Sequence, residues 1–272
     1  MERRMRLWTR LLSLSAILSL GSTVAHALEF DGVIEPYVLV KVGSGVAGII
    51  ETVDVERGDL VKKGQVVARL QSGVEKAAME VARARAETEA TIRAKQTQLD
   101  FSSRKRQRHE QLYKKEAMAF SQMDEADTGR AMAEMELKEA MENKRLAELE
   151  FRRAFEVVKR LTIHSAIDGV VVERFLSPGE YVEDQPILKL AQINPLNVEV
   201  ILPVVRFPSI RVGMRAQVIP EEPIGGRYTA QVKIIDRVID AASGTFGVRL
   251  ELPNPEHRLP AGLKCKVIFP DQ

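Results

Sequence analysis

The order of hydrophobic and polar residues divides the chain into segments with different periods. Between residues 30 and 70, apolar and polar positions alternate in short runs that glycines interrupt, which is typical of short β-strands. Residues 74–161 contain no proline and one glycine, Gly129, and they are rich in alanine, glutamate, lysine and arginine, which favour helix. After this helical stretch the alternating pattern returns and continues to the C-terminus.

The second half of the helical stretch carries a seam of mostly small apolar residues, with Lys144 as its only charged member. Its heptad spacing predicts two antiparallel helices of about forty residues each, in a coiled-coil hairpin on the order of 60 Å long. We expect the chain to reverse near residues 115–123, with Ser121 as the N-cap of the second helix. The seam of the second helix consists of Ala133, Leu137, Ala140, Lys144, Ala147, Phe151, Ala154, Val158 and Leu161. A weaker seam in the first helix consists of Val74, Ala78, Val81, Arg85, Thr88, Ile92, Lys95 and Leu99.

One strand pattern occurs twice, once before and once after the helical stretch. Residues 48–70 and 169–190 each begin with a glycine and a β-branched run, and each has a second glycine at the same spacing, Gly58 and Gly179. Neither half is large enough to bury an apolar face alone. We therefore expect the two halves to close on each other as a pseudo-twofold β-sandwich, with positive φ at both turn glycines.

From Asn194 onward, short alternating runs are separated by glycines and prolines, which indicates a small β-barrel. Together these patterns predict an elongated multidomain α+β protein. The expected parts are a signal peptide at 1–27, the first sandwich half at 28–72, a helical hairpin at 73–161, the second sandwich half at 162–192 and a β-barrel at 193–272.

The N-terminus has the features of a secretory signal. Several arginines precede an apolar run at residues 11–20, and Ala25-His26-Ala27 follows as the small-x-small pattern that signal peptidase cuts. We expect export to the periplasm with cleavage after Ala27, so that the mature protein begins at Leu28. The alternative is an uncleaved anchor, but the apolar run is shorter than the roughly 20 residues that a spanning helix needs. The net charge of +2 arises from these arginines, so it gives no argument for binding nucleic acid.

The sequence lacks the patterns of catalytic and metal sites. Its four histidines are scattered, and the single cysteine, Cys265, cannot form an internal disulfide. Methionines gather around the expected hairpin tip and along the second helix; they can bind copper(I), but we favour packing because no cysteine or histidine pairs with them. These methionines are Met118, Met123, Met132, Met135 and Met141. We therefore expect no enzymatic activity and no cofactor.

Residues 44–70, the helical arm, residues 163–200 and residues 247–269 resemble the periplasmic adaptor subunits of tripartite efflux pumps, the HlyD-like membrane fusion proteins. The resemblance covers almost all of the mature chain. It implies a lipoyl-like sandwich in two halves, an inserted hairpin and a β-barrel. The sequence ends about where the barrel ends, so we expect the membrane-proximal domain of many members to be absent or very small.

The resemblance also implies a function. The adaptor would link an inner-membrane transporter, of RND or ABC type, to an outer-membrane channel for the export of small molecules. It would form a homo-oligomeric ring, a trimer or a hexamer, and remain associated with the inner membrane through its transporter. The alternative is a periplasmic protein that binds a small molecule or a metal and delivers it to a pump.

Hairpin tips in this family often carry Arg-x-x-x-Leu, six further residues and then Ser, which dock on the channel. Arg108 and Leu112 match this pattern, the serine position is Ala119, and the nearest serine is Ser121. The resemblance implies that Arg108 donates to carbonyls or carboxylates of the channel and that Leu112 fills a gap between channel helices. The alternative is that both are ordinary residues of the arm.

Overall fold

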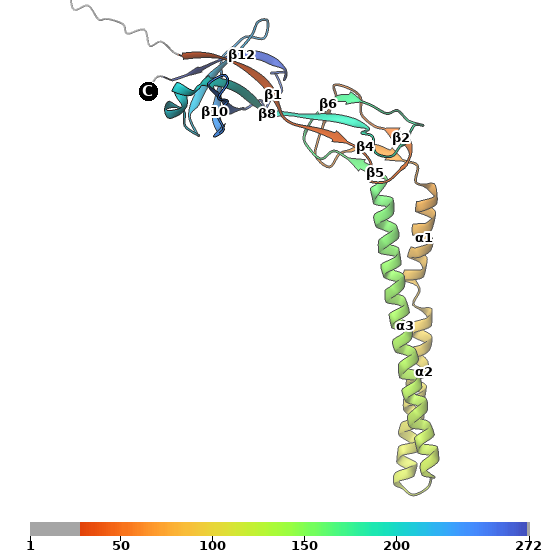
Figure 1. Ribbon diagram of the computed structural model, residues 1–272. Helices are drawn as coiled ribbons and strands as arrows, with labels where there is room; N and C mark the ends of the chain where they lie inside the picture. The colour runs from red at the N-terminus through yellow and green to blue at the C-terminus, as the bar shows by residue number, and fades with distance from the viewer. Residues whose placement is uncertain (1–27, 271–272) are drawn as a thin grey trace, which may run out of the picture. The chain divides into compact units, whose positions relative to one another are not determined.

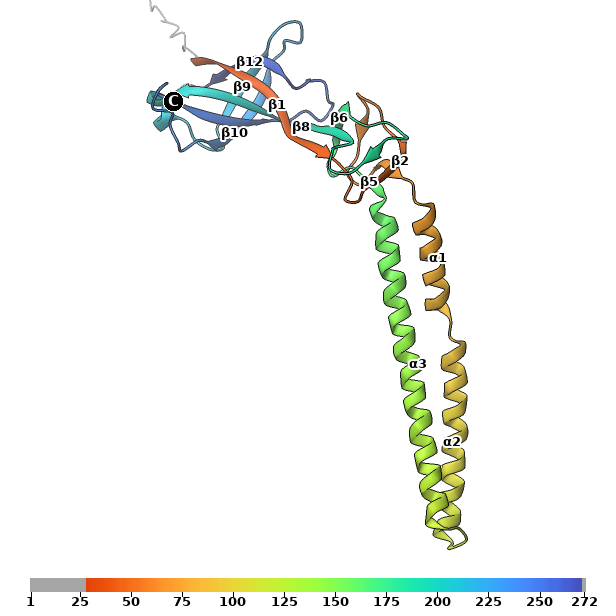
Figure 2. The same ribbon diagram turned by 45° about the vertical axis from the view of Figure 1, so that its right-hand side comes forward.

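The computed structural model describes residues 28–270, which form two compact units (Figures 1 and 2). One unit consists of residues 35–197 and 253–262, and the other contains residues 198–252 together with the start of the first strand and the last strand. The expected signal peptide, residues 1–27, lies outside the described residues. Within the described part of the chain, no helix combines the length and the apolar character needed to span a membrane.

The first unit contains a small β-sandwich whose strands come from both sides of the helical stretch. One sheet has the order β5-β4-β2-β7, and β3 pairs with β6, so strands of the two halves are hydrogen-bonded to one another. The strands involved are β1 (Leu28–Val42), β2 (Gly48–Val53), β3 (Leu60–Val61), β4 (Val66–Leu70), β5 (Thr162–His164), β6 (Gly169–Arg174), β7 (Tyr181–Val182) and β8 (Leu188–Pro203).

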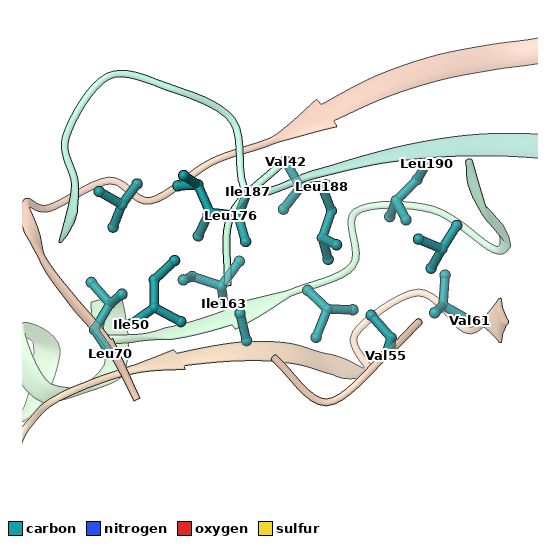
Figure 3. Close-up of a cluster of buried hydrophobic side chains, with 14 of the residues drawn as sticks. Val42, Ile50, Val55, Val61, Leu70, Ile163, Leu176, Ile187, Leu188 and Leu190 are labelled. Atoms are coloured by element: carbon teal, nitrogen blue, oxygen red, sulfur yellow. The ribbon is translucent and has the colours of Figure 1, made fainter. Parts of the chain in front are cut away.

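The two halves share one hydrophobic core. Ile50 and Leu70 of the first half and Leu188 and Leu190 of the second half are at most 1% exposed. Figure 3 shows these side chains directed into one layer between the strands of the two halves. The prediction of a lipoyl-like sandwich made of two sequence-separated halves is confirmed.

Each half also completes the other through its turn. The Gly58 N–H donates to the Val171 carbonyl (2.9 Å), and the Gly179 N–H donates to the Ile50 carbonyl (2.8 Å). The residue after each glycine accepts a hydrogen bond back from the same strand residue of the other half, at 2.9 Å in both cases. The repeated sequence therefore folds as a pseudo-twofold exchange of turns.

Both turn glycines have positive φ, 96° at Gly58 and 90° at Gly179, as predicted. A Cβ at either position would meet nothing within 4 Å, so a side chain would cost backbone strain alone. We expect Gly58→Val and Gly179→Val each to lower the free energy of unfolding of the sandwich by on the order of 1–3 kcal/mol. Native-state hydrogen exchange at the sandwich amides measures this loss. A costly substitution at one glycine and a silent one at the other would contradict the equivalence of the two halves.

The helical stretch forms a hairpin in which α1 (Gly73–Glu87) and α2 (Ala90–Lys114) lie alongside α3 (Phe120–Arg160) in both views (Figures 1 and 2). The returning arm is one helix of 41 residues, as predicted. The prediction of a single helix for the outgoing arm is wrong. Thr88 adopts an extended conformation, with φ −73° and ψ 117°, and this ends α1.

The break changes which face of the outgoing arm packs on α3. All predicted seam residues of α3 are buried or half-buried. In α1 the predicted seam is wrong, because Val74 is 80% exposed and Val81 is 54% exposed, whereas Met79 and Ala86 lie on the less exposed face. Beyond the break, α2 keeps its predicted face, on which Ile92 is half-buried. The non-helical residues thus shift the heptad phase between α1 and α2.

The charged member of the α3 seam makes an ion pair with a residue of this break. The Lys144 ammonium donates to the Glu89 carboxylate at 2.9 Å, and Arg93 lies 3.6 Å from the same carboxylate. The hydrogen bond and the charge of Lys144, followed by the charge of Arg93, lower the pKa of Glu89. A lysine is therefore tolerated in the seam because its charge is paired where the outgoing helix is interrupted.

The second unit is a β-barrel with the strand order β1-β12-β9-β10-β11-β8. β1 also pairs with β8, and this pairing closes the barrel. Its interior contains fully buried side chains such as Val218, Phe246 and Leu250. The additional elements are η1 (Val204–Ser209), a 3-10 helix, and the strands β9 (Arg215–Pro220), β10 (Tyr228–Ile235), β11 (Thr245–Leu252) and β12 (Leu263–Phe269). The predicted C-terminal barrel is therefore present.

Candidate docking site at the hairpin tip

The hairpin reverses within residues 115–119, inside the predicted range. α2 ends in a Schellman turn, in which the Glu116 N–H donates to the Tyr113 carbonyl (2.8 Å) and the Ala117 N–H donates to the Leu112 carbonyl (3.0 Å). Glu116 has a φ of 55°, in the left-handed region that glycine usually occupies at this position. A non-glycine residue there costs roughly 1–2 kcal/mol. The tip thus has the exposed carboxylate of Glu116 at a position where a glycine would be less strained.

The start of α3 differs from the prediction. The helix begins at Phe120, so Ser121 is not the N-cap, and that prediction is wrong. Ala119 occupies the N-cap position without a side-chain capping bond, and its carbonyl accepts the Gln122 N–H at 3.1 Å. The Schellman turn uses few residues, so α3 starts before Ser121, which is exposed in the first helical turn.

Polar contacts join the two arms just below the tip. Arg106 on α2 forms an ion pair with Asp127 on α3, and this contact raises the pKa of the guanidinium. His109 Nδ1 lies 3.2 Å from the Gln122 carbonyl oxygen, which adds a second link between the arms. The ion pair joins two half-buried residues and the His109 contact is exposed, so solvent reaches both and each adds little stability by itself. Together they fix the direction in which the tip residues point.

The four predicted docking residues are all exposed. Arg108 has no ion-pair or side-chain hydrogen-bond partner among residues 28–270, and the Leu112 side chain is 42% exposed. The two residues are one helical turn apart on α2, so they lie on the same face. Ala119 and Ser121 lie across the turn, at the start of α3. The structure therefore leaves Arg108 and Leu112 available to a partner.

An aromatic pair at the tip was missed by the sequence reasoning. Tyr113 near the end of α2 and Phe120 at the start of α3 meet edge to face, with ring centroids 6.0 Å apart. Phe120 is 66% exposed and Tyr113 is 43% exposed. Rigid exposed aromatic rings are frequent anchors of protein interfaces. Their signal in the sequence was their position on either side of the reversal, in a chain with only 5% aromatic residues.

Within residues 28–270, no three His, Cys, Asp or Glu side chains lie close enough to hold a metal ion. Met123 is buried between the helices, as the packing interpretation predicts. That interpretation is wrong for Met132, Met135 and Met141, which are 49–69% exposed because they lie off the seam. The only cysteine, Cys265, is buried in the barrel, and burial raises the pKa of its thiol to about 11.

Models of known protein families match two stretches of the chain. Residues 38–192 match the family model for the CzcB-like barrel-sandwich hybrid domain, and residues 196–272 match the model for the CusB-like β-barrel domain. The chain belongs to the CzcB-like barrel-sandwich hybrid family of membrane fusion proteins. Members of this class are periplasmic adaptors of efflux systems.

Solved structures of other proteins share the fold of this membrane fusion protein. MacA from Actinobacillus actinomycetemcomitans aligns with a TM-score of 0.75 and 23% identity, over 90% of this chain and 79% of MacA. The membrane fusion protein Spr0693 from Streptococcus pneumoniae R6 aligns with a TM-score of 0.63 and 14% identity, over 90% of this chain and all of Spr0693 (100%). At sequence identities of 14–23%, the similarity shows that the chain shares the fold of these two proteins.

Two curated relatives are longer than this membrane fusion protein. A membrane protein of Acidithiobacillus ferridurans is 30% identical over 120 residues, which is 40% of this chain and 36% of the relative. An uncharacterised protein of Haemophilus influenzae is 23% identical over 249 residues, which is 90% of this chain and 58% of the relative. The chain thus matches between about a third and just over half of their length.

Proposed function

We propose that this membrane fusion protein links an inner-membrane transporter, of RND or ABC type, to an outer-membrane channel, and that it serves the export of small molecules. The observation that carries the proposal is the tip of the hairpin. The hairpin reverses at its end away from the sandwich (Figures 1 and 2). Near this reversal lie the unpaired guanidinium of Arg108, the exposed Leu112 side chain and the exposed aromatic pair of Tyr113 and Phe120. Such a surface suits a polar and apolar protein partner.

The same proposal includes assembly and location. Copies of the chain form a ring, a trimer or a hexamer, through head-to-tail contacts that close by rotation. The protein works without catalysis, because its task is to hold two membrane components together. It acts in the periplasm after removal of the signal peptide, and N-terminal sequencing of the exported protein should find Leu28 first.

Photo-crosslinking in cells tests the docking role of the tip. A photoreactive amino acid at Phe120 should capture the outer-membrane channel, because this side chain is 66% exposed at the turn. The matched control is the same amino acid at Leu149, which is 47% exposed on the shaft of α3 and should not capture the channel.

Two results would argue against the proposal. Capture of the channel from both positions would show that the contact is not specific to the tip. No channel adduct from either position, together with a stoichiometric small molecule or metal in the purified protein, would favour the cargo-delivery alternative.

A further inference from the structure

Two neighbouring loops at one end of the barrel present aliphatic side chains to solvent. Val205 in η1 is 78% exposed, and Val238 in the turn between β10 and β11 is 86% exposed. Single exposed aliphatic residues are ordinary on protein surfaces, but a group of them marks an interaction site. We call this group the barrel-end patch, and it consists of Val204, Val205, Phe207, Val238 and Ile239, all at least 37% exposed.

The two loops of the barrel-end patch are joined to each other and to the barrel. The Val204 N–H donates to the Gly244 carbonyl at 2.9 Å, which links η1 to the β10–β11 turn. The Phe207 ring packs edge to face on the buried Phe246, with centroids 5.1 Å apart. The turn is closed by a hydrogen bond from the Asp240 N–H to the Thr245 carbonyl at 2.9 Å. The exposed valines are therefore held in place by the fold.

Unpaired cations adjoin the exposed valines in both loops. Arg206 follows Val205, and Arg237 precedes Val238, and neither arginine has an ion-pair partner within residues 28–270. The turn also contains two carboxylates, and that of Asp240 already accepts hydrogen bonds from the Ala242 N–H and the Ser243 hydroxyl. The barrel-end patch thus combines apolar side chains with two guanidinium groups that have no ion-pair partner among residues 28–270. The carboxylates of Asp236 and Asp240 offset their formal charge, and the guanidinium groups themselves are complementary to the phosphates of an anionic lipid surface.

The strand register places the N-terminal end of the described chain on the same side of the barrel. Leu28 pairs with Phe269 at the end of β12, and Ile268 pairs with Gln217 near the start of β9. β9 is antiparallel to β10, which runs toward the β10–β11 turn. In the sequence, the apolar run at residues 11–20 that we expect to enter the inner membrane during export lies shortly before Leu28. This side of the barrel is therefore the side at which the sequence that precedes Leu28 joins the described chain.

We propose that the barrel-end patch binds the periplasmic surface of the inner membrane. The valines, Ile239 and Phe207 enter the boundary between headgroups and acyl chains, and Arg206 and Arg237 contact anionic headgroups. Few apolar residues take part, so the binding of one copy is weak and reversible. Several copies in one assembly would strengthen it by multivalency.

Flotation with lipid vesicles tests this proposal on protein purified from the periplasm, after sequencing has shown that it begins at Leu28. Vesicles of phosphatidylethanolamine with phosphatidylglycerol should bind the protein, and vesicles of phosphatidylcholine alone should bind it less. We expect Val205→Asp and Val238→Asp each to lower binding about tenfold, the effect of losing one buried valine. Arg206→Gln and Arg237→Gln should weaken binding to the anionic vesicles about fivefold each.

The control variant is Ile224→Asp, because Ile224 is 42% exposed in the loop between β9 and β10, at the opposite end of these strands. It should bind vesicles like the unmodified protein, and thermal melting should show that all variants fold. Equal binding by the Val238→Asp variant and the unmodified protein would overturn the proposal. Photo-crosslinking from position 238 that captures the transporter and no lipid would also overturn it, because the patch would then be a protein interface.

Discussion

We expect Arg108→Asp and Leu112→Asp each to lower export about tenfold or more, while both variants fold and are secreted normally. Both side chains are exposed at the tip, so neither change removes a contact from the protein's own core. Arg108→Asp would repel carbonyl or carboxylate groups of a partner. Leu112→Asp would bury an unpaired carboxylate on docking. An efflux assay and thermal melting of each variant provide the two measurements.

The matched controls lie on the same hairpin. Arg104→Asp makes the same charge change one helical turn below Arg108, and Leu149→Asp replaces a leucine of similar exposure on the shaft of α3. Both should export normally. Full export by the Arg108 and Leu112 variants, at normal protein levels, would show that the tip does not dock through them. A fall in melting temperature together with lost export would instead place these residues in the internal packing of the hairpin.

Gly169→Ala should lower the free energy of unfolding of the sandwich by about 3 kcal/mol or more. A Cβ at Gly169 would lie 2.2 Å from the carbonyl oxygen of Ala191 and 2.8 Å from its carbonyl carbon. Both atoms belong to the backbone of β8, so the overlap can be relieved only if the pairing of β6 with β8 shifts. Native-state hydrogen exchange at the amide of Val171 measures the loss.

Gly48→Ala is the control for this change, because Gly48 begins the first copy of the repeat. Its Cβ would meet the Leu70 side chain, with the nearest atom at 3.3 Å, and a side chain can move by a few tenths of an ångström. We expect a much smaller loss for Gly48→Ala than for Gly169→Ala. Equal losses would show that the approach of the β8 backbone does not determine the cost at Gly169.

Patterns that repeat along the chain predicted most of the fold. The repeated glycines and β-branched runs indicated the two-part sandwich, and the heptad seam of α3 indicated the hairpin. The break at Thr88 could not be predicted, because helix-forming residues predominate on both sides of it and no glycine or proline marks it. A prediction that treats the outgoing arm as one continuous helix places the seam of α1 on the wrong face. The reason is that heptad positions are counted through every residue, including the non-helical residues of the break.

The docking residues could be proposed only in part from the sequence. Arg108 and Leu112 were found because they match a known spacing, whereas Tyr113 and Phe120 match no motif and form a pair only through the turn geometry. The left-handed conformation of Glu116 is likewise invisible in the sequence, since glycine is the usual residue at that position. The exposure of Val205 and Val238 could not be predicted either, because valine is one of the residues most often buried in proteins.

The exchange of turns between the sandwich halves has a consequence for the order of folding. The Lys63 N–H donates to the Asp168 carboxylate across 105 residues, and Arg174 binds Glu56 across 118 residues. The first half must therefore leave the ribosome and remain without its core until the whole hairpin has been synthesised. Contacts between residues so far apart in the sequence form slowly, whereas helices form quickly because their contacts are local. Closure of the antiparallel hairpin would bring the two halves together, so its assembly sets the time at which the sandwich can fold.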